Sequence, residues 1–409
     1  MFNELIENIT NVRVFTDSIS LWVENLSVNT VIIFIMMIFM IVGAVDKMRG
    51  NKLGYGEQFD EGLNAMGPLA IAMLGVVAAA PVLALILKPI VVPVYELFGA
   101  AASMFAGTLL AIDMGGYPLA MQLGTDEAVG NFAGIILGSM MGTTVVFTIP
   151  VALTLIRKED KSYLAAGILA GLITVPVGCL AGGLVMNITS YKMSIVGILV
   201  NLIPVILIAG LIVLGLWFVP QKMISGFNKF GTGLTILITF CTAAAVFQYE
   251  TGIKFPLLNI MVEPDESGVI PLESGIATVG QIAIVLIGAF PMVTWITRTF
   301  GRSLARIGTK LGMDDAGAAG LITTMANNIA MFNTMGEMNA KGKLLNVAFA
   351  VSASFVFGDH LGFVAGVNQE FILPMVAGKL AAGITALLLA NLLAPKLLCK
   401  IASNQTEQQ

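Results

Sequence analysis

The residues of this sequence best placed to do chemistry are acids inside otherwise apolar stretches. Asp113 lies in SMFAGTLLAIDMGGYPLA, with a largely apolar run before it and Gly115 and Gly116 after it. A carboxylate deep in a membrane costs several kcal/mol unless it has a partner, so we interpret Asp113 as functional. The two glycines allow a helix to unwind beside the acid, which would expose carbonyl oxygens to a bound cation. A structural cap at a helix end is the alternative.

A second acid stands next to the single histidine of the chain. Asp359 and His360 lie in SASFVFGDHLGFVAG, within a stretch apolar enough to span a membrane. An acid and an imidazole together could pair with each other, bind a solute or shuttle a proton. A packed pair that neutralises itself is the structural alternative.

Two further pairs carry polarity of other kinds. Asn327 and Asn328 in MANNIAMF could hydrogen-bond a hydroxyl or an amine without a charge penalty, or could link helices to one another. Tyr95 and Glu96 in PVYELFGA place an acid beside an aromatic face, where a cation-π contact could hold an ammonium. The alternative for this pair is that the side chains reach to a membrane surface.

Motifs of soluble enzymes are missing from the sequence. It has no P-loop, HExxH, GxSxG or Gly-rich dinucleotide fingerprint in a credible context, so we predict no ATP-driven transport, no catalytic residues and no cofactor. Cys179, Cys241 and Cys399 lie far apart without metal or redox spacing, and we predict no metal site. A membrane enzyme using Asp359 and His360 for acid-base work stays open.

The composition requires a lipid bilayer around these residues. Hydrophobic residues make up 57% of the chain and charged residues 11%, and the mean hydropathy is +0.91, so no soluble surface could be covered. We predict an all-α fold, a polytopic transmembrane helical bundle. One membrane domain is expected over 28–397, with a short amino-terminal segment at 1–27 and a polar tail at 398–409. Nothing indicates nucleic acid as a partner.

Apolar stretches of about 20 residues, long enough to cross a bilayer, recur along the chain. The nine strongest lie near 28–46, 64–87, 130–155, 162–186, 194–218, 231–248, 275–297, 344–366 and 372–394. Two more segments, 89–120 and 310–336, are apolar but interrupted by glycines and polar residues. The sequence therefore predicts about nine to eleven spans.

The charges of the loops suggest how the interrupted segments run. Lys and Arg concentrate near 47–52, 157–161, 222–229 and 298–310, which should face the cytoplasm, whereas 122–130 and 249–273 are acidic and should face outward. The nine strong spans alternate without contradiction only if 89–120 begins and ends outside and 310–336 begins and ends inside. We therefore predict two re-entrant hairpins, each a wall of a site. A pair of ordinary spans in each segment is the alternative.

The chain also resembles itself at an offset of 213 residues. Matches connect Gly67, Ala70, Ile71 and Gly75 with Gly280, Ala283, Ile284 and Gly288, and further matches extend over four elements in order. The span at 64–87 runs outward and its copy at 275–297 runs inward, so the halves are inverted, as in many transporters. We predict inverted repeats near 28–186 and 231–397 with 194–218 linking them.

Longer strings connect the chain with a known family. The segments GEQFDEGLNAMGPLAIAMLG (56–75), PVYELFGA (93–100), SMFAGTLLAIDMGG (103–116), MANNIAMF (325–332) and GDHLGF (358–363) resemble the bacterial ethanolamine permeases of ethanolamine-utilisation operons. The resemblance covers about residues 28 to 397, and residues 1–27 depart from it. It implies a multi-pass protein of the bacterial cytoplasmic (inner) membrane that imports ethanolamine. The resemblance also implies that the ethanolamine enters a microcompartment pathway whose ammonia-lyase requires cobalamin. That cofactor belongs to the enzyme and not to this chain.

Ethanolamine suits the acids described above. A primary amine that titrates roughly near 10, as Lys does, is almost wholly cationic at neutral pH. Our hypothesis assigns Asp113 to the ammonium, Asn327 and Asn328 to the hydroxyl, and Asp359 with His360 to charge compensation or proton linkage. An ion-coupled carrier for another small amine or amino acid is the main alternative, and association into a homo-oligomer stays open.

Overall fold

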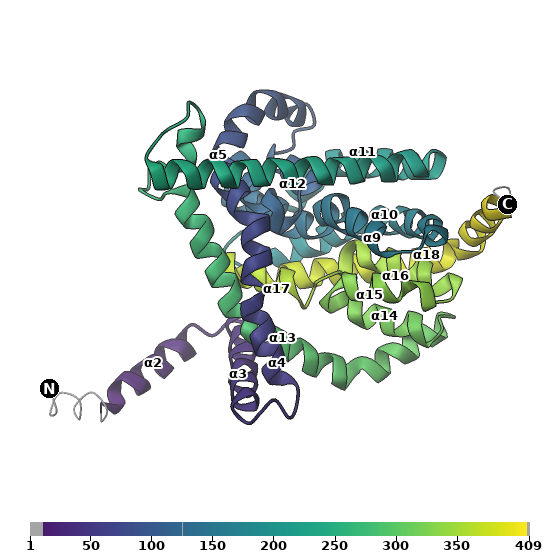
Figure 1. Ribbon diagram of the computed structural model, residues 1–409, viewed down its shortest axis with the longest axis horizontal. Coiled ribbons are helices and arrows are strands. Elements are labelled where there is room, and N and C mark those ends of the chain that lie inside the picture. Colours follow the sequence, from purple (N-terminus) through teal and green to yellow (C-terminus); the bar gives the residue numbers. More distant parts are fainter. Residues whose placement is uncertain (1–10, 125, 407–409) are drawn as a thin grey trace.

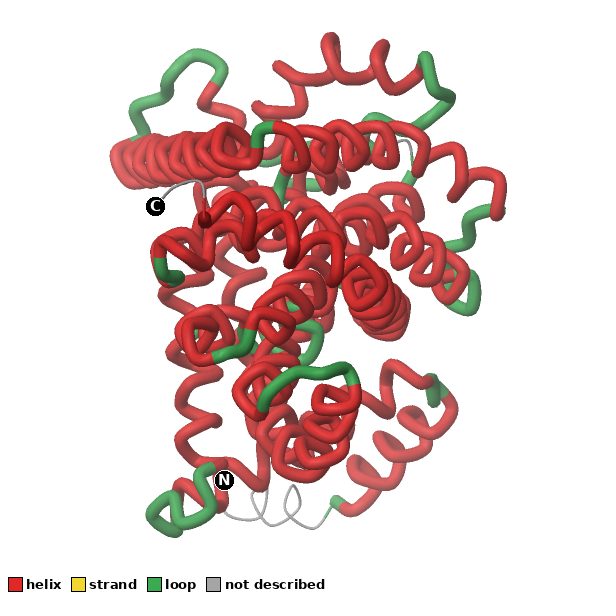
Figure 2. The backbone as a smooth tube through the Cα atoms, turned by 90° about the vertical axis from the view of Figure 1, so that its right-hand side faces the viewer, coloured by secondary structure: helices red, strands yellow, loops and turns green. Residues whose placement is uncertain are grey.

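The computed structural model describes residues 11–124 and 126–406, and every regular element within these ranges is a helix. Eight helical segments of this part of the chain are long and apolar enough to cross a membrane: Val28–Met48, Tyr55–Glu96, Glu127–Leu155, Lys158–Met186, Ile195–Phe218, Pro220–Thr251, Pro271–Gly301 and Gln369–Ser403. Figure 2 shows the described part of the chain as helices connected by loops. The all-α, multi-span prediction is confirmed.

Most of the helices are labelled in Figure 1. In chain order they are α2 (Val12–Glu24), α3 (Val28–Met48), α4 (Tyr55–Asn64), α5 (Met66–Glu96), α6 (Ser103–Leu109), α7 (Tyr117–Leu123), α8 (Glu127–Asn131), α9 (Ile149–Leu155), α10 (Lys161–Met186), α11 (Ile195–Phe218), α12 (Pro220–Thr251), α13 (Pro271–Lys310), α14 (Asp315–Ala326), α15 (Asn328–Thr334), α16 (Ala340–Ala353), α17 (Asp359–Val367) and α18 (Ile372–Thr406). A π-helical stretch, Phe132–Gly142, continues α8. Of the predicted terminal segments, residues 1–10 and 407–409 lie outside the described residues.

One predicted span, 344–366, is not a continuous helix. It is divided into α16 and α17 by a break at 354–358. Phe355 in this break has a φ of 60°, a left-handed conformation that costs a non-glycine residue of the order of 1–3 kcal/mol. Gly358 packs so closely on the backbone of Ala326 that a Cβ would lie 2.1 Å from its carbonyl oxygen. The break is therefore built into the packing of the second half of the chain.

The first interrupted segment folds as a helical hairpin made of α6, an unwound turn and α7. The turn is closed by the carbonyl oxygen of Ala111, which accepts hydrogen bonds from the amides of Met114 at 3.0 Å and Gly116 at 2.8 Å. Both arms pack on the π-helical stretch 132–142, where Gly107 meets the Ala133 carbonyl. The hairpin covers 103–123 rather than 89–120, because residues 89–96 continue α5.

The second interrupted segment is a hairpin of α14 and α15 with Asn327 at its tip. The Asp314 carboxylate connects the two ends of the hairpin. It accepts a hydrogen bond from the amide of Gly317, in the first turn of α14, at 3.0 Å, and another from the amide of Asn339, which follows the hairpin, at 2.8 Å. The segment therefore begins and ends on one side of the bundle. This is the side of the Lys- and Arg-rich loops, because Gly336 contacts Arg157.

Packing between the halves is reciprocal. α3 packs on α13, and α12 packs on α5, while α10 and α18 lie against each other along the middle of the bundle (Figure 1). Where α10 and α18 cross, the Thr174 hydroxyl donates to the Ala382 carbonyl at 3.1 Å, and Gly178 faces the Gly378 carbonyl. Small residues permit such close approach. The repeat boundaries themselves stay a prediction.

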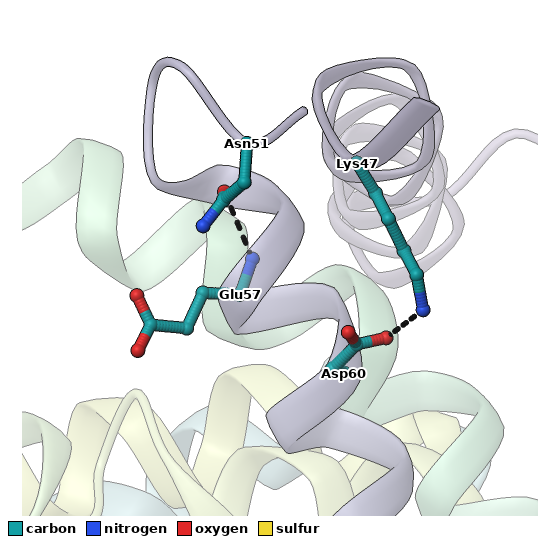
Figure 3. Close-up of polar contacts among 4 residues, drawn as sticks. All are labelled: Lys47, Asn51, Glu57 and Asp60. Atoms are coloured by element: carbon teal, nitrogen blue, oxygen red, sulfur yellow. Dashed lines mark hydrogen bonds and ion pairs between the residues drawn. The ribbon is translucent and has the colours of Figure 1, made fainter. Parts of the chain in front are cut away.

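The turn between α3 and α4 forms the inner end of the first half. Lys47 pairs with Asp60, and the Asn51 side chain accepts from the amide of Glu57 at 3.1 Å, whereas the Glu57 carboxylate points away from the ion pair (Figure 3). Asp46 accepts from three further backbone amides of this turn. These acids stabilise the turn that starts the long α4–α5 segment.

Candidate functional site

A cavity of about 410 Å³ lies where the tips of the two hairpins approach the break between α16 and α17. Among its lining residues are Asp113 from the first tip, Asn327 from the second, and Asp359 and His360 from the start of α17. Four of the residues singled out in the sequence thus meet in one place, although they come from three separate segments. The carboxylates of Asp113 and Asp359 thus face the same cavity, and a third acid, the exposed Glu61, also lines it.

Asp113 is presented to the cavity by the unwound turn of the first hairpin. Gly115, two residues on, has a φ of 95°, and a Cβ there would lie 2.3 Å from Val76 Cγ2. Only glycine fits that combination of conformation and contact. Gly115 and Gly116 are buried behind the tip and do not line the cavity, so their contribution is to the shape of the turn rather than a direct contact.

Asp359 and His360 are held by backbone hydrogen bonds between the break and the second hairpin. The Phe355 amide donates to the Thr324 carbonyl at 3.2 Å, and the Phe357 amide donates to the Met325 carbonyl at 3.0 Å. These bonds join the break to the end of α14, directly before the hairpin tip. The acid and the imidazole are thereby fixed relative to the tip.

The two neighbouring asparagines have different surroundings. Asn327 Oδ1 accepts from the amide of Ile329 at 2.8 Å as the cap of α15, which leaves its NH₂ group to face the cavity. Asn328 is fully buried, and its NH₂ group donates to the hydroxyls of Thr148 at 3.1 Å and Ser354 at 3.2 Å. Asn328 therefore holds elements together and does not line the cavity, and its contact with solute stays a prediction.

Phenylalanines provide the aromatic wall of the cavity. Phe147, Phe290 and Phe355 line it, and the Phe355 ring lies 5.7 Å from that of Phe147 in an edge-on arrangement. The predicted aromatic and acidic pair does not contribute, because Tyr95 is buried against Phe105 and Glu96 is exposed at the end of α5. The sequence did not reveal which aromatic residues face inward.

Lys379 is a charged residue of this region that the sequence analysis missed. It lies on α18 with no exposed surface, and its Nζ donates to the Ser139 carbonyl at 2.5 Å and to His360 Nδ1 at 3.0 Å. The signal was present, because Lys379 is the only charged residue in the predicted span 372–394. The rule that intramembrane ionisable residues are functional applies to it as it does to Asp113.

The cavity opens toward the side of the basic loops. An adjoining pocket shares Glu61, Phe290, Asn327 and Asp359 with it and extends to Arg298. Arg298 donates to the carbonyl of Leu53, in the turn that follows α3. The cavity is therefore continuous with the face of the bundle that carries the basic loops.

A separate hollow of about 390 Å³ lies on the opposite side of the hairpin tip. It is lined by Tyr117 and Gln122 and by Glu263 and Asp265 of the acidic loop 252–270. Asp265 lies outside the spans, and hydrogen bonds from the Ser267 side chain and the Val269 amide hold its pKa below the ordinary value. The hollow therefore carries negative charge at neutral pH.

A thin layer of residues separates the outer hollow from the inner cavity. On α5 this layer is formed by Val76. Residues of α5 before Val76 line the cavity, residues after it line the hollow, and Val76 itself packs on Gly115. Beside it the Tyr117 and Phe363 rings meet edge-on with centroids 5.8 Å apart. The outer hollow and the inner cavity are therefore two separate chambers on either side of this layer.

The groups that line the cavity suit the binding of a cationic solute. Two carboxylates and three aromatic faces suit an ammonium ion, and an amide NH₂ suits a hydroxyl oxygen. Within residues 11–124 and 126–406, no group of three His, Cys, Asp or Glu residues is placed to hold a metal ion. The cavity is several times larger than a solute of four heavy atoms, so water must share it.

Over most of its length the chain is similar to a described protein family. The family described as "Ethanolamine utilisation protein, EutH" matches residues 28–393. A protein of Listeria monocytogenes named "Probable ethanolamine permease EutH" is 51% identical over 384 residues, covering 94% of this chain and 98% of its own length. Its namesake in Escherichia coli is 47% identical, covering 91% and 97%, and the "Uncharacterized protein YxeR" of Bacillus subtilis is 45% identical, covering 90% and 96%. No solved structure matches the chain significantly.

Proposed function

This chain belongs to the EutH family of ethanolamine utilisation proteins, and from that membership we propose that it is a permease that carries ethanolamine across the bacterial cytoplasmic membrane. The observation that carries the proposal is the meeting of Asp113 and Asp359 in one cavity between the hairpin tips. Intramembrane carboxylates are costly, and a cationic solute would offset that cost.

The contacts follow from what each group can offer. Ethanolamine is a cation at neutral pH, and hydrocarbon cannot replace the hydration of its ammonium. Asp113 and Asp359 would take the ammonium between them, with the Phe355 ring as a π face beside it. The NH₂ group of Asn327 would donate to the hydroxyl oxygen, since the carbonyl oxygen of the same side chain is occupied as a cap.

The route follows from the positions of the two chambers. Solute would collect in the acidic outer hollow, pass the layer of Val76, Gly115 and Tyr117 when that layer opens, and leave through the inner mouth at Glu61 and Asn64. Inverted repeats allow such alternation by exchange of the conformations of the two halves. In this proposal the present conformation is the inward-open end of the cycle.

Uptake into proteoliposomes tests the proposal. Vesicles containing the purified chain should accumulate radiolabelled ethanolamine with saturable kinetics, and protein-free vesicles should not. Recovery of chemically intact ethanolamine from the lumen would distinguish a carrier from a membrane enzyme, and saturation would distinguish it from a channel. If excess alanine blocked uptake as well as excess ethanolamine, the solute assignment would fail in favour of a broader carrier.

A further inference from the structure

Lys379 has no part in the contacts proposed above, yet it lies next to the cavity. It is one of the largest fully buried side chains of the described residues, and it reaches His360 from behind the cavity wall. A buried ammonium is costly unless paired or fully hydrogen-bonded, so its presence needs a physical reason. The Ser139 carbonyl and the imidazole are its hydrogen-bond partners.

The hydrogen-bond partners of His360 indicate which of its ring nitrogens carries the proton. The Thr143 hydroxyl donates to the Gly138 carbonyl at 2.9 Å, which leaves Thr143 Oγ1 as an acceptor for His360 Nε2 at 3.5 Å. An ammonium can only donate, so Nδ1 must accept from Lys379. The imidazole is then neutral with its proton on Nε2. A second proton on Nδ1 would break the bond to Lys379 and place two cations together.

The charges near the cavity can now be counted. Asp113 and Asp359 line the cavity, and Lys379 reaches its wall through the hydrogen bond to His360. With both carboxylates ionised and Lys379 protonated, these three groups carry one net negative charge, and a neutral His360 adds none. Glu61, the other charged lining residue, is exposed at the mouth, where water and salt screen it. One monovalent cation therefore neutralises the site.

We propose that Lys379 is a resident counter-cation that makes this cavity accept a single monovalent ammonium and reject dications. This inference rests on the proposed function and specifies the solute class of the same site. A dication would leave an uncompensated positive charge in a poorly polarisable interior, which costs far more there than in water. Without Lys379 the two carboxylates would suit a dication instead.

The wild-type chain provides the first test. Purified full-length protein in detergent is loaded with radiolabelled ethanolamine, and propylamine and 1,3-diaminopropane are compared as competitors. The two probes have the same carbon chain and differ by a second amine, which is also charged near neutral pH. The diamine should compete at least about ten-fold more weakly, which corresponds to 1.4 kcal/mol. Equal competition by the two probes would overturn the inference.

Charge variants of Lys379 provide the second test. Lys379→Met should shift the ratio of diamine to monoamine affinity by about ten-fold or more in favour of the diamine, whereas Lys379→Arg should keep the wild-type ratio. Lys400→Met is the matched control, because Lys400 lies on the same helix but is only partly buried, over Trp217 at the other end of α18. A folded Lys379→Met protein with an unchanged ratio would also overturn the inference.

The outcomes distinguish the two proposals. If the wild-type chain binds no amine at all, the ethanolamine carrier proposal fails. If it binds ethanolamine and propylamine but does not discriminate against the diamine, only the role of Lys379 fails. Should neither Lys379 variant give a monodisperse protein, the wild-type comparison still decides.

Discussion

Asp113 and Asn327 face the same cavity from the tips of two hairpins that enter the bundle from opposite sides. One tip provides a carboxylate and the other an amide, so the two halves of the chain contribute different chemistry to one solute. This pair suits a molecule with an amine at one end and a hydroxyl at the other.

Asp113→Asn should abolish ethanolamine uptake while leaving the protein folded. The substitution keeps the shape of the side chain but removes the charge that pairs with the ammonium, and loss of one partner of a buried charge pair costs 2–5 kcal/mol. Affinity should therefore fall by roughly 30- to 3,000-fold. The measurement is proteoliposome uptake together with binding in detergent.

Asp60→Asn is the matched control for that variant. Its carboxylate pairs with Lys47 on the exposed inner turn, and exposed ion pairs contribute little. It should transport normally. Wild-type uptake by Asp113→Asn would remove this acid from the proposed contacts.

Asn327→Ser should reduce the preference for ethanolamine over ethylamine. Serine can still cap α15 through its hydroxyl, but it no longer presents an NH₂ donor to the cavity. Because a hydrogen bond contributes about 0.5–1.5 kcal/mol net, the preference should fall by roughly three- to ten-fold. Competition binding with the two amines measures it.

The neighbouring position gives a contrasting variant. Asn328→Ala removes the bonds to Thr148 and Ser354, so it should lower the thermal stability and leave the preference unchanged. If Asn328→Ala changed the preference and Asn327→Ser did not, the assignments of the two asparagines would have to be exchanged.

Gly115→Ala should lower the free energy of unfolding by at least about 2 kcal/mol. The left-handed backbone accounts for about 1–2 kcal/mol of this, and the clash with Val76 adds to it. Adding Val76→Ala should relieve the clash and restore that part of the free energy of unfolding, but it should not restore the part lost to the left-handed backbone. Thermal unfolding in detergent measures all three proteins.

Gly226→Ala is the comparison for that series. Gly226 lies in α12 with open space around its Cα, so alanine there should be neutral or stabilising by about 0.5–1 kcal/mol. A Gly115→Ala protein as stable as the wild type would show that the hairpin tip is not packed as described.

Asn64→Cys, in a background where the exposed Cys399 is serine, should react with a membrane-impermeant maleimide only from the side of the basic loops. Asn64 is exposed at the mouth of the inner cavity. Saturating ethanolamine should slow the reaction. Gln122→Cys, in the outer hollow, should react from the opposite side. Labelling of Asn64→Cys from the outer side alone would reverse the assigned orientation.

Much of the architecture could be predicted from local features of the sequence. Loop charges and apolar length alone indicated hairpins at 89–120 and 310–336, and the cost of buried charge singled out Asp113 and Asp359. Which face of a helix points inward was not accessible in this way. Asn327 caps α15 with an extended backbone and lines the cavity, whereas Asn328 is the first residue of that helix and lies in the packing.

Residues whose role depends on distant partners were the ones missed or misplaced. The position of Lys379 within a predicted span was a usable signal that it is functional. Its hydrogen-bond partners, His360 and Ser139, are distant in the sequence and become known only from the packing. Tyr95 and Glu96 looked suitable because an acid stood next to an aromatic ring, but α5 ends away from the cavity. Composition indicates what a side chain could do, and only packing decides where it is.

The hydrogen bonds from Phe355 and Phe357 to the end of α14 have a mechanical consequence. They connect the second hairpin to the start of α17, so we expect Asn327 to move together with Asp359 and His360. During transport this part of the cavity wall would then move as one rigid body relative to the hairpin tip that carries Asp113, and the solute would lie between the two.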